Sequence, residues 1–520
     1  MVVKALLCLL PIVLVMVLML KFRIPTHWCG IWGWVCTALL ALLFFQTGPE
    51  AILRASGSGI LSSFPISLMV LFSILQITFM ESTGALHRIS VFIKTLAVRN
   101  KPSQVMLINI GAGTSLVALG ATPVSVLPPI MRDLGYSPFI SIAMPAIGFD
   151  ALCTFSMLGA PLLTYCDFTG VGIVEAAQIF AGFLPVISTA ICLSMLWILG
   201  GRQMIWQGLP QALLAGLTAG GVAWLMAHVS FLQTGVLLTG VVAGLAVVLI
   251  QMLFLKLKGL PIVDRSVLTE SDKAIEAGMP LLKALSPWLI LLFALLLTNF
   301  CKPIHDFLFI RLEMAVAALP QSPVKLRMLW NAYFWVLAST ALSFIILKPT
   351  KEQLRITLAK WGKRGPKPFV SAAIFFAIGL LMNNTGLALT DGVWQIADQH
   401  NNMIFALSSV SADLAGRFYP LLPAPLGLFG GFLTGSEASA IAMFTKFNVL
   451  TAELLKLDPL IMAAATGVAG GVASVCTPAK LQNAAATIDA MGEEVAVMKK
   501  TFKVAVILVL ITSLVCYIVS

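Results

Sequence analysis

The chain has 520 residues, of which 59% are hydrophobic and 11% are charged, and its mean hydropathy is +0.98. A water-soluble domain of this length would aggregate with such a composition, so soluble enzymes and soluble binding modules are excluded. The formal net charge of +11 does not indicate nucleic-acid binding, because the basic residues gather in a few loops between apolar segments.

Apolar segments long enough to cross a membrane as helices recur along the chain. They lie at 3–21, 26–46, 63–82, 137–158, 175–199, 210–229, 231–256, 281–300, 328–347, 368–384 and 502–519. Three more segments, 103–133, 420–450 and 459–488, are apolar but contain many Gly, Ser and Thr residues. The sequence therefore predicts an all-α polytopic membrane protein with roughly 12 spans, since these runs are too long for barrel strands.

The distribution of basic residues predicts the orientation of the spans. Segment 348–368 carries seven Lys or Arg residues against the single acid Glu352, so we expect it in the cytoplasm. Because successive spans cross the membrane in opposite directions, the loops alternate between its two sides. Counting from 348–368, further basic segments also lie in the cytoplasm, namely the Lys21/Arg23 turn, Arg88–Lys101, 257–280 and Lys499–Lys503. The same alternation places 386–420 and both termini outside.

A Met-x-x-Thr-Gly pattern closes two apolar spans, FMESTGAL at 79–86 and LMNNTGLAL at 381–389. Each is followed by a glycine-rich segment and then by a span entered through Pro138 or Pro459. The charge argument places the first pattern inside and the second outside, which predicts two inverted repeats. The expected organisation is N-terminal spans at 1–62, a first repeat at 63–200 with a hairpin near 103–133, connecting spans at 201–347, and a second repeat at 348–520 with a hairpin near 420–450.

Several short motifs predict helix starts inside the membrane. GATPVSV and VCTPAKL each place a Thr cap before a Pro, at Thr122 and Thr477, and LTGSEAS places Gly435 and Ser436 before Glu437. MLGAPLL contains a weaker break at Gly159–Pro161. Irregular backbone at membrane depth must line protein or a watery cavity, and helix starts attract anions, so we expect the breaks to surround an anion site. Simple kinking of ordinary helices is the alternative.

Candidate site residues follow from these breaks. Glu437 is the first candidate for proton coupling and Asp150 the second, because a carboxyl at membrane depth must face the interior, pair or hold a proton. Lys480 could bind a substrate carboxylate, pair with either acid, or extend to the headgroups. The substrate-binding candidates are Thr114, Ser115, Thr122, Thr434, Ser436, Thr477 and Lys480. The candidates for an ion site or gate are Thr83, Asn383, Asn384 and Thr385. No metal cluster, nucleotide motif or catalytic triad appears in the sequence, so we expect neither cofactor nor enzyme activity.

The segment GGFLTGSEASAIAMF at 430–444, followed by ATGVAGGVASVCTPAKLQNAAA, resembles the closing region of the lactate permease family. Members of that family typically read FLTGS, an acid and small residues, then a Thr-Gly-Gly segment ending in Ser-Pro. In the first half, GATP, LGYSP and the Leu-Gly-Ala-Pro stretch at 158–161 follow in the family's order. The resemblance spans nearly the whole chain, and FLTGSE is its specific match.

This resemblance implies proton-coupled uptake of lactate, glycolate and similar 2-hydroxy monocarboxylates across the bacterial inner membrane. It implies a small organic anion, a proton and the lipid bilayer as partners; elevator movement and a homodimer are expectations by analogy. The sequence departs from the family in three places: Ser115–Ala118 carries no acid where the family has Glu-Gly-Ala-Ala, Ser474 stands where the family has Lys, and Asp150 has no counterpart. A sodium-coupled or dicarboxylate carrier, an integral membrane enzyme and a channel stay open as alternatives.

Overall fold

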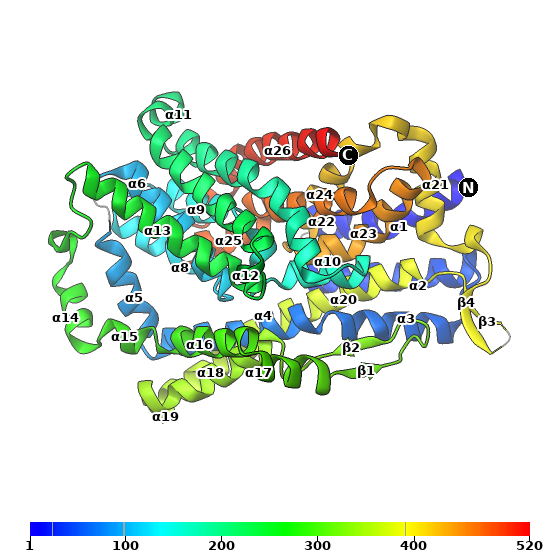
Figure 1. The fold of residues 1–520 in the computed structure, drawn as a ribbon, viewed down its shortest axis with the longest axis horizontal. Helices are drawn as coiled ribbons and strands as arrows, with labels where there is room; N and C mark the ends of the chain where they lie inside the picture. The colour runs from blue at the N-terminus through cyan, green and yellow to red at the C-terminus, as the bar shows by residue number, and fades with distance from the viewer. Residues whose placement is uncertain (23, 97–98, 391) are drawn as a thin grey trace.

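The computed structural model describes residues 1–22, 24–96, 99–390 and 392–520, and nearly all of its regular structure is helical (Figure 1). Within these ranges, nine helices are long and apolar enough to cross a membrane, or ten if one bent pair counts as a span. The predicted all-α polytopic architecture is therefore confirmed. Arg23 of the predicted basic turn lies outside the described residues.

A first helix group packs around α4 and α20. Its members are α2 Thr26–Phe44, α3 Pro49–Ser62, α4 Phe64–Ser82, α16 Ser286–Phe300, α18 Ala332–Leu347, α19 Lys351–Arg364 and α20 Pro366–Asn383. The ends of these helices follow from the sequence. Pro49 and Pro366 open α3 and α20, and Thr350 with Gln353 forms a capping box at the start of α19.

A second helix group packs around α9, α11 and α24. Its members are α6 Lys101–Val105, a π-helical stretch Met106–Ala112, α7 Gly113–Ala118, α8 Pro123–Asp133, α9 Pro138–Gly148, α10 Ala160–Thr169, α11 Ile173–His228, α13 Thr239–Leu257, α22 Pro423–Thr434, α23 Glu437–Leu455, α24 Pro459–Val472, α25 Pro478–Ala486 and α26 Glu493–Val519. Helix α11 is kinked at Gly200–Gly201, where the sequence predicts the end of one span and a loop before the next. The two groups meet mainly where α20 packs on α23 and α4 on α10.

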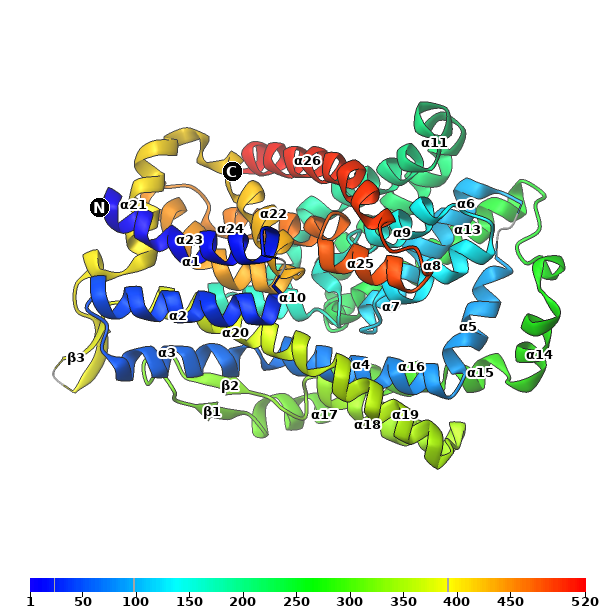
Figure 2. The same ribbon diagram turned by 180° about the vertical axis from the view of Figure 1, so that it is seen from behind.

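The remaining elements connect the two groups. They are α1 Val2–Leu20, α5 Ala85–Lys94, α12 Ser230–Gln233, α14 Glu270–Gly278, α15 Leu281–Ala284, α17 Lys302–Asp306, α21 Met403–Ala415, and two antiparallel hairpins, β1 Met314–Val316 with β2 Val324–Leu326 and β3 Leu387–Thr390 with β4 Val393–Ile396. The apolar pattern predicts neither hairpin. The N-terminus and the β3–β4 hairpin lie at one end of the molecule, α5 and α14 lie at the other, and the C-terminus lies between the two ends, nearer to the N-terminus (Figures 1 and 2). This arrangement agrees with the sides that the charge pattern assigns to them.

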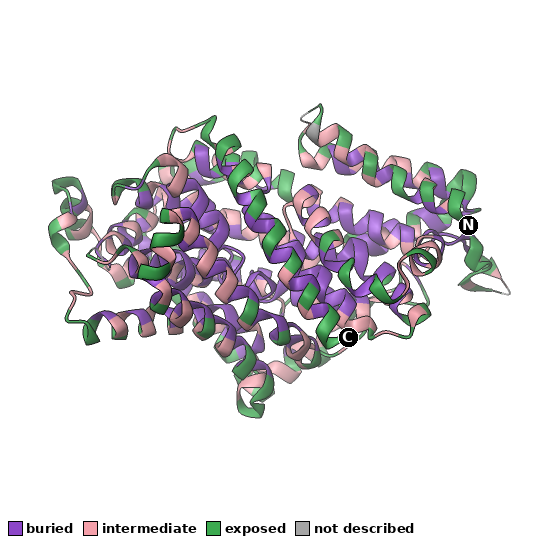
Figure 3. Ribbon diagram, turned by 90° about the horizontal axis from the view of Figure 1, so that it is seen from above, coloured by how far each residue is buried: buried purple, intermediate pink, exposed green. Residues whose placement is uncertain are grey.

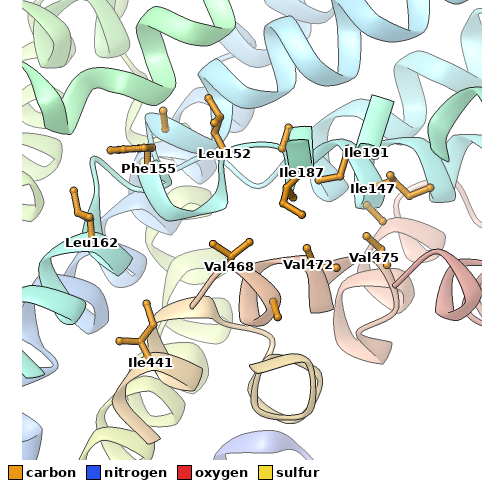
Figure 4. Close-up of a cluster of buried hydrophobic side chains, with 14 of the residues drawn as sticks. Ile147, Leu152, Phe155, Leu162, Ile187, Ile191, Ile441, Val468, Val472 and Val475 are labelled. Carbon is orange, nitrogen blue, oxygen red and sulfur yellow. The ribbon is translucent and has the colours of Figure 1, made fainter. Parts of the chain in front are cut away.

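One large cluster of buried apolar residues extends through both helix groups. Buried residues concentrate on the inward faces of the helices, and exposed residues cover their outer faces (Figure 3). Leu152 and Phe155, between α9 and α10, belong to the same apolar cluster as Val468, Val472 and Val475 of α24 and the turn after it (Figure 4). Apolar side chains on the outer faces, such as Leu249 and Leu510, are suited to contact lipid.

The structure differs from the predicted spans in two places. The predicted span 137–158 ends at Gly148, and the chain runs irregularly to Gly159 apart from a 3₁₀ turn at Cys153–Phe155. Pro145 and the left-handed residues Met157 and Leu158 show why one continuous helix does not form. Helix α3 was not among the predicted spans, because its small and polar residues lower the hydropathy of 49–62.

Candidate functional site

The first interruption is the turn between α7 and α8. Gly120 has φ +87° and packs against Ser73 of α4, so a side chain there would be strained and would collide. Helix α8 begins at Pro123, as predicted. The predicted cap is wrong, because the Thr122 hydroxyl accepts no hydrogen bond from the first turn of α8.

The second interruption is the turn between α22 and α23. Gly435 is left-handed with φ +72°, and the Ser436 hydroxyl accepts a hydrogen bond from the backbone N–H of Ser439 at 3.3 Å. Glu437 is the first residue of α23, so the predicted cap and helix start are confirmed. Helix α22 has 12 residues, about 18 Å of helix, and is too short to cross a membrane alone. It packs along α23 and α24 and therefore forms a hairpin with its tip at Gly435.

Two helices are broken next to these tips. Helix α9 is separated from α10 by residues 149–159, and α24 is separated from α25 by residues 473–477. Pro478 occupies the first position of α25, as predicted. The Thr477 hydroxyl donates to the Ala473 carbonyl at 2.8 Å instead of capping α25, so this predicted cap is wrong.

A cavity of about 410 Å³ lies where the hairpin tips and the broken helices meet. The starts of α8, α10, α23 and α25 all contribute lining residues, and residues of α4 and α20 line the opposite side. The cavity thus lies between the two helix groups. Prolines at the starts of α8, α10 and α25 remove backbone donors, so α23 offers the least restricted N–H groups to an anion.

Glu437 lines this cavity but is only 3% exposed. Its Oε1 accepts a hydrogen bond from the Thr154 hydroxyl at 2.7 Å, which joins the start of α23 to the break after α9. Its Oε2 has no hydrogen-bond partner in the described ranges. A side chain at Gly471 would place its Cβ 2.7 Å from Oε2 and 2.9 Å from Cβ of Cys153, so the absence of a side chain there leaves room for the carboxyl group.

Lys480 also lines the cavity, and its ammonium group points inward rather than toward the membrane surface. The Nζ atom donates to the Ser474 hydroxyl and lies 3.6 Å from the centre of the Phe149 ring. Asp150 is 3% exposed, lies within electrostatic range of Lys480 and Glu437, and has no hydrogen-bond partner on either carboxyl oxygen among the residues that the structure describes. Lys480 therefore lies near two buried acids but forms no ion pair within 4 Å with either of them in those residues.

The structure brings together only part of the predicted set. Thr122, Thr434, Ser436, Glu437 and Lys480 line the cavity, and Asp150 and Thr477 lie buried behind its wall. Thr114 and Ser115 lie in α7 away from the cavity, and the Ser115 hydroxyl donates to Gly111.

The predicted ion or gate residues lie elsewhere. The Thr83 hydroxyl donates to the Phe79 carbonyl at 2.9 Å at the end of α4. The Asn384 side chain donates to Leu380, and the Thr385 hydroxyl accepts from the N–H of Met403 at 2.7 Å. Asn383, Asn384 and Thr385 lie at the end of α20, and none of the four lines the cavity. Their contacts stabilise the ends of two helices.

Sequence reasoning missed Thr154, Gly471 and Lys367. Thr154 lies in an apolar stretch that reads as one uninterrupted span, so no signal marked it. Gly471 is one of several small residues in α24 that allow close helix packing, and its role depends on a contact with a distant segment. Lys367 lies in the basic segment that we assigned to a cytoplasmic loop, yet it lines the cavity.

The comparison with known proteins covers almost the whole chain. The chain is 22% identical to the L-lactate permease of Streptococcus iniae, over 89% of this chain and 93% of that protein. It is 22% identical to the L-lactate permease of Escherichia coli strain K12, over 98% and 95%, and 23% identical to the glycolate permease of the same organism, over 96% and 92%. The family model for L-lactate permease matches residues 4–520, so the chain belongs to the L-lactate permease family and is a multi-pass transporter of the bacterial inner membrane.

Proposed function

We propose that the chain carries small 2-hydroxy monocarboxylates such as L-lactate and glycolate together with a proton. The cavity at the four helix starts is the observation that supports this most directly. Its volume of about 410 Å³ suits a small ligand, and it combines two lysines, Lys367 and Lys480, with hydroxyl groups and the N-terminus of α23. The lactate and glycolate permeases among the relatives carry the same class of substrate in their names.

The charges around the cavity explain how an anion and a proton can be coupled. Among the residues that the structure describes, Lys480 is the basic residue beside Glu437 and Asp150. A substrate carboxylate that binds Lys480 adds a second or third negative charge to this buried group. Because several unbalanced negative charges are costly at membrane depth, anion binding favours a protonated Glu437. The substrate and the proton would then cross together.

The order of the interruptions supports a duplication in which the repeats are 63–200 and 348–520. Each repeat contains a hairpin tip followed by a broken helix. The tips correspond at Thr122 and Ser436, 314 positions apart, and the helix starts after the breaks correspond at Pro161 and Pro478, 317 positions apart. The similar Thr-Pro motifs at Thr122 and Thr477 therefore do not correspond to each other in this pairing. Inverted orientation of the two repeats would place both tips at one central site.

The proposal is tested with purified protein in liposomes. Labelled L-lactate, glycolate and succinate are offered under an imposed proton gradient, an imposed sodium gradient, or neither. We expect the two monocarboxylates to accumulate with the proton gradient alone. Accumulation that follows the sodium gradient would refute proton coupling, and a preference for succinate would refute the monocarboxylate assignment.

A further inference from the structure

A second, larger cavity adjoins the first. It has a volume of about 920 Å³ and is bordered by α4, α5, α8, α14 and the α19–α20 junction, and we call it the vestibule. Seven residues line both cavities: Ser73, Ile74, Gly120, Thr122, Lys367, Pro368 and Asn483. They form the neck between the two cavities. Lys367 is the charged residue among them.

Lys367 is an exposed lysine at the junction of α19 and α20. It is the second residue of α20, between Pro366 and Pro368, and the helical backbone continues from α19 through Gly365 into α20. Across the described part of the chain it forms no ion pair within 4 Å, whereas neighbouring Lys360 and Arg364 both pair with Glu81 at 2.6 and 3.2 Å. Pro366 and Pro368 restrict the backbone on both sides of Lys367. The backbone, and not an ion pair with an acid, therefore positions Lys367 at the neck.

The groups opposite Lys367 belong to the other helix group. Thr122 is at the tip before α8, and Asn483 of α25 donates its amide to the Ser125 hydroxyl of α8 at 2.7 Å. Lys367 is on the side of α4 and α20, while Lys480 is on the side of the broken helices. An anion that leaves Lys480 for the vestibule must therefore pass a second cation across the boundary between the groups.

We propose that Lys367 is a second binding position for the substrate carboxylate, which receives the anion at the neck between the Lys480 cavity and the vestibule. The proposal rests on the proposed function and adds a residue to it. An ammonium that has no acidic partner can bind a carboxylate without first breaking an ion pair. Thr122 and Asn483 supply further hydrogen-bonding groups on the opposite side of the neck.

The test compares Lys367→Gln, Lys367→Arg and Lys363→Gln in liposomes loaded with unlabelled L-lactate. Lys363 is a matched control, because it is exposed, lines the vestibule but not the cavity, and carries the same charge. Exchange of labelled external L-lactate is measured without any ion gradient. We expect Lys367→Gln to raise the half-saturation concentration about tenfold. Lys363→Gln should change it less than about twofold, and Lys367→Arg should stay close to the unchanged protein.

Equal effects of Lys367→Gln and Lys363→Gln would overturn the proposal, since they would reflect only the general charge of the vestibule. An unchanged half-saturation concentration in Lys367→Gln would overturn the proposal as well. If Lys367→Arg lost as much exchange as Lys367→Gln, the side chain of Lys367 would have a packing role and not a charge-dependent binding role. If Lys367→Gln does not purify as a folded protein, the comparison is made with Lys367→Met at the same position. Failure of the unchanged protein to exchange any monocarboxylate would refute the proposed function itself, independently of Lys367.

Discussion

Glu437 is held between two segments that are more than 280 residues apart in sequence. Thr154 binds one oxygen of its carboxyl group and the other oxygen faces Gly471, so the side chain depends on contacts from the break after α9 and from α24. Substitution of the carboxyl by an amide keeps the size of the side chain and the hydrogen bond from Thr154, but removes the titration.

We therefore expect Glu437→Gln to abolish proton-driven accumulation of L-lactate while exchange of internal for external L-lactate continues, because exchange requires no net movement of protons. Both rates are measured on the same liposome preparation. Asp150→Asn serves as the comparison, since Asp150 shares Lys480 but lies behind the wall of the cavity. Undiminished driven uptake in Glu437→Gln together with loss in Asp150→Asn would transfer the proton role to Asp150.

Gly471 provides a test of the space around Glu437. A methyl group there would displace the Glu437 carboxyl and press on Cys153, so we expect Gly471→Ala to reduce L-lactate exchange and to destabilise the protein by about 1–3 kcal/mol. Gly182→Ala in α11 is the control, because a Cβ at Gly182 meets no atom within 4 Å. Exchange and thermal unfolding are measured for both. Normal exchange in Gly471→Ala would show that the Glu437 carboxyl has room to move.

For single residues, the sequence could predict a role only where that role depends on residues nearby in the chain. Ser436 was predicted correctly because a cap depends on the next three residues, and Glu437 stood out as an acid in an apolar segment. Thr122 and Thr477 have the same local pattern but do not cap, since Thr477 bonds to the preceding turn. Thr154 and Lys367 could not be predicted, because their importance arises from segments that meet only after folding.

At the scale of elements, Lys94 joins three helices near the vestibule. At the end of α5 its Nζ contacts Asp133 of α8 at 2.6 Å and Asp272 of α14 at 2.9 Å. Burial raises the pKa of Asp272, but hydrogen bonds from Lys94 and Thr269 outweigh burial and hold this pKa below its ordinary value. Burial also lowers the pKa of Lys94, and its two acidic partners outweigh it and raise this pKa above its ordinary value.

We expect Lys94→Met to destabilise the protein by about 2 kcal/mol, because it leaves Asp272 buried without its cation. Lys101→Met is the control, since Lys101 is exposed and has no ion pair among the described residues. Thermal unfolding in detergent measures both. The difference between them should persist at neutral pH and vanish in acid as the pH falls through the lowered pKa of Asp272, because that acid is then protonated and no longer binds Lys94. An equal loss of stability in Lys101→Met would contradict the proposed role of the Lys94 ion pairs.

The elements themselves were predictable to different degrees. Continuous apolar runs such as 502–519 and 175–199 lie within observed helices, because a span depends only on local hydropathy. The break at 149–159 was hidden, because most of its residues are apolar and the chain is turned there by the left-handed residues Met157 and Leu158. Helix α3 was missed for the opposite reason: it is polar enough to read as a loop but packs closely against α20 through Gly59.

At the scale of the whole molecule, two groups of helices enclose the cavity, and their boundary passes through the site. Lys367 and Ser73 lie on one side of this boundary, and Glu437 and Lys480 lie on the other. Any movement of one group relative to the other would therefore change the distance between the side chains on the two sides of the boundary. The vestibule lies on the side of the basic segment 348–368, so a cytoplasmic position of that segment means that the described arrangement is open to the cytoplasm.

This orientation can be measured directly with single cysteine substitutions at opposite ends of the molecule. Gln395 of β4 and Lys363 of α19 are both exposed, and the two elements lie toward opposite ends (Figure 1). Seven basic residues in 348–368 predict that this end stays in the cytoplasm. In intact cells a membrane-impermeant maleimide should therefore label Gln395→Cys, and it should label Lys363→Cys only after permeabilisation. The nine native cysteines of the unsubstituted chain provide the background. Labelling of Lys363→Cys in intact cells would reverse the orientation and would turn the vestibule toward the outside.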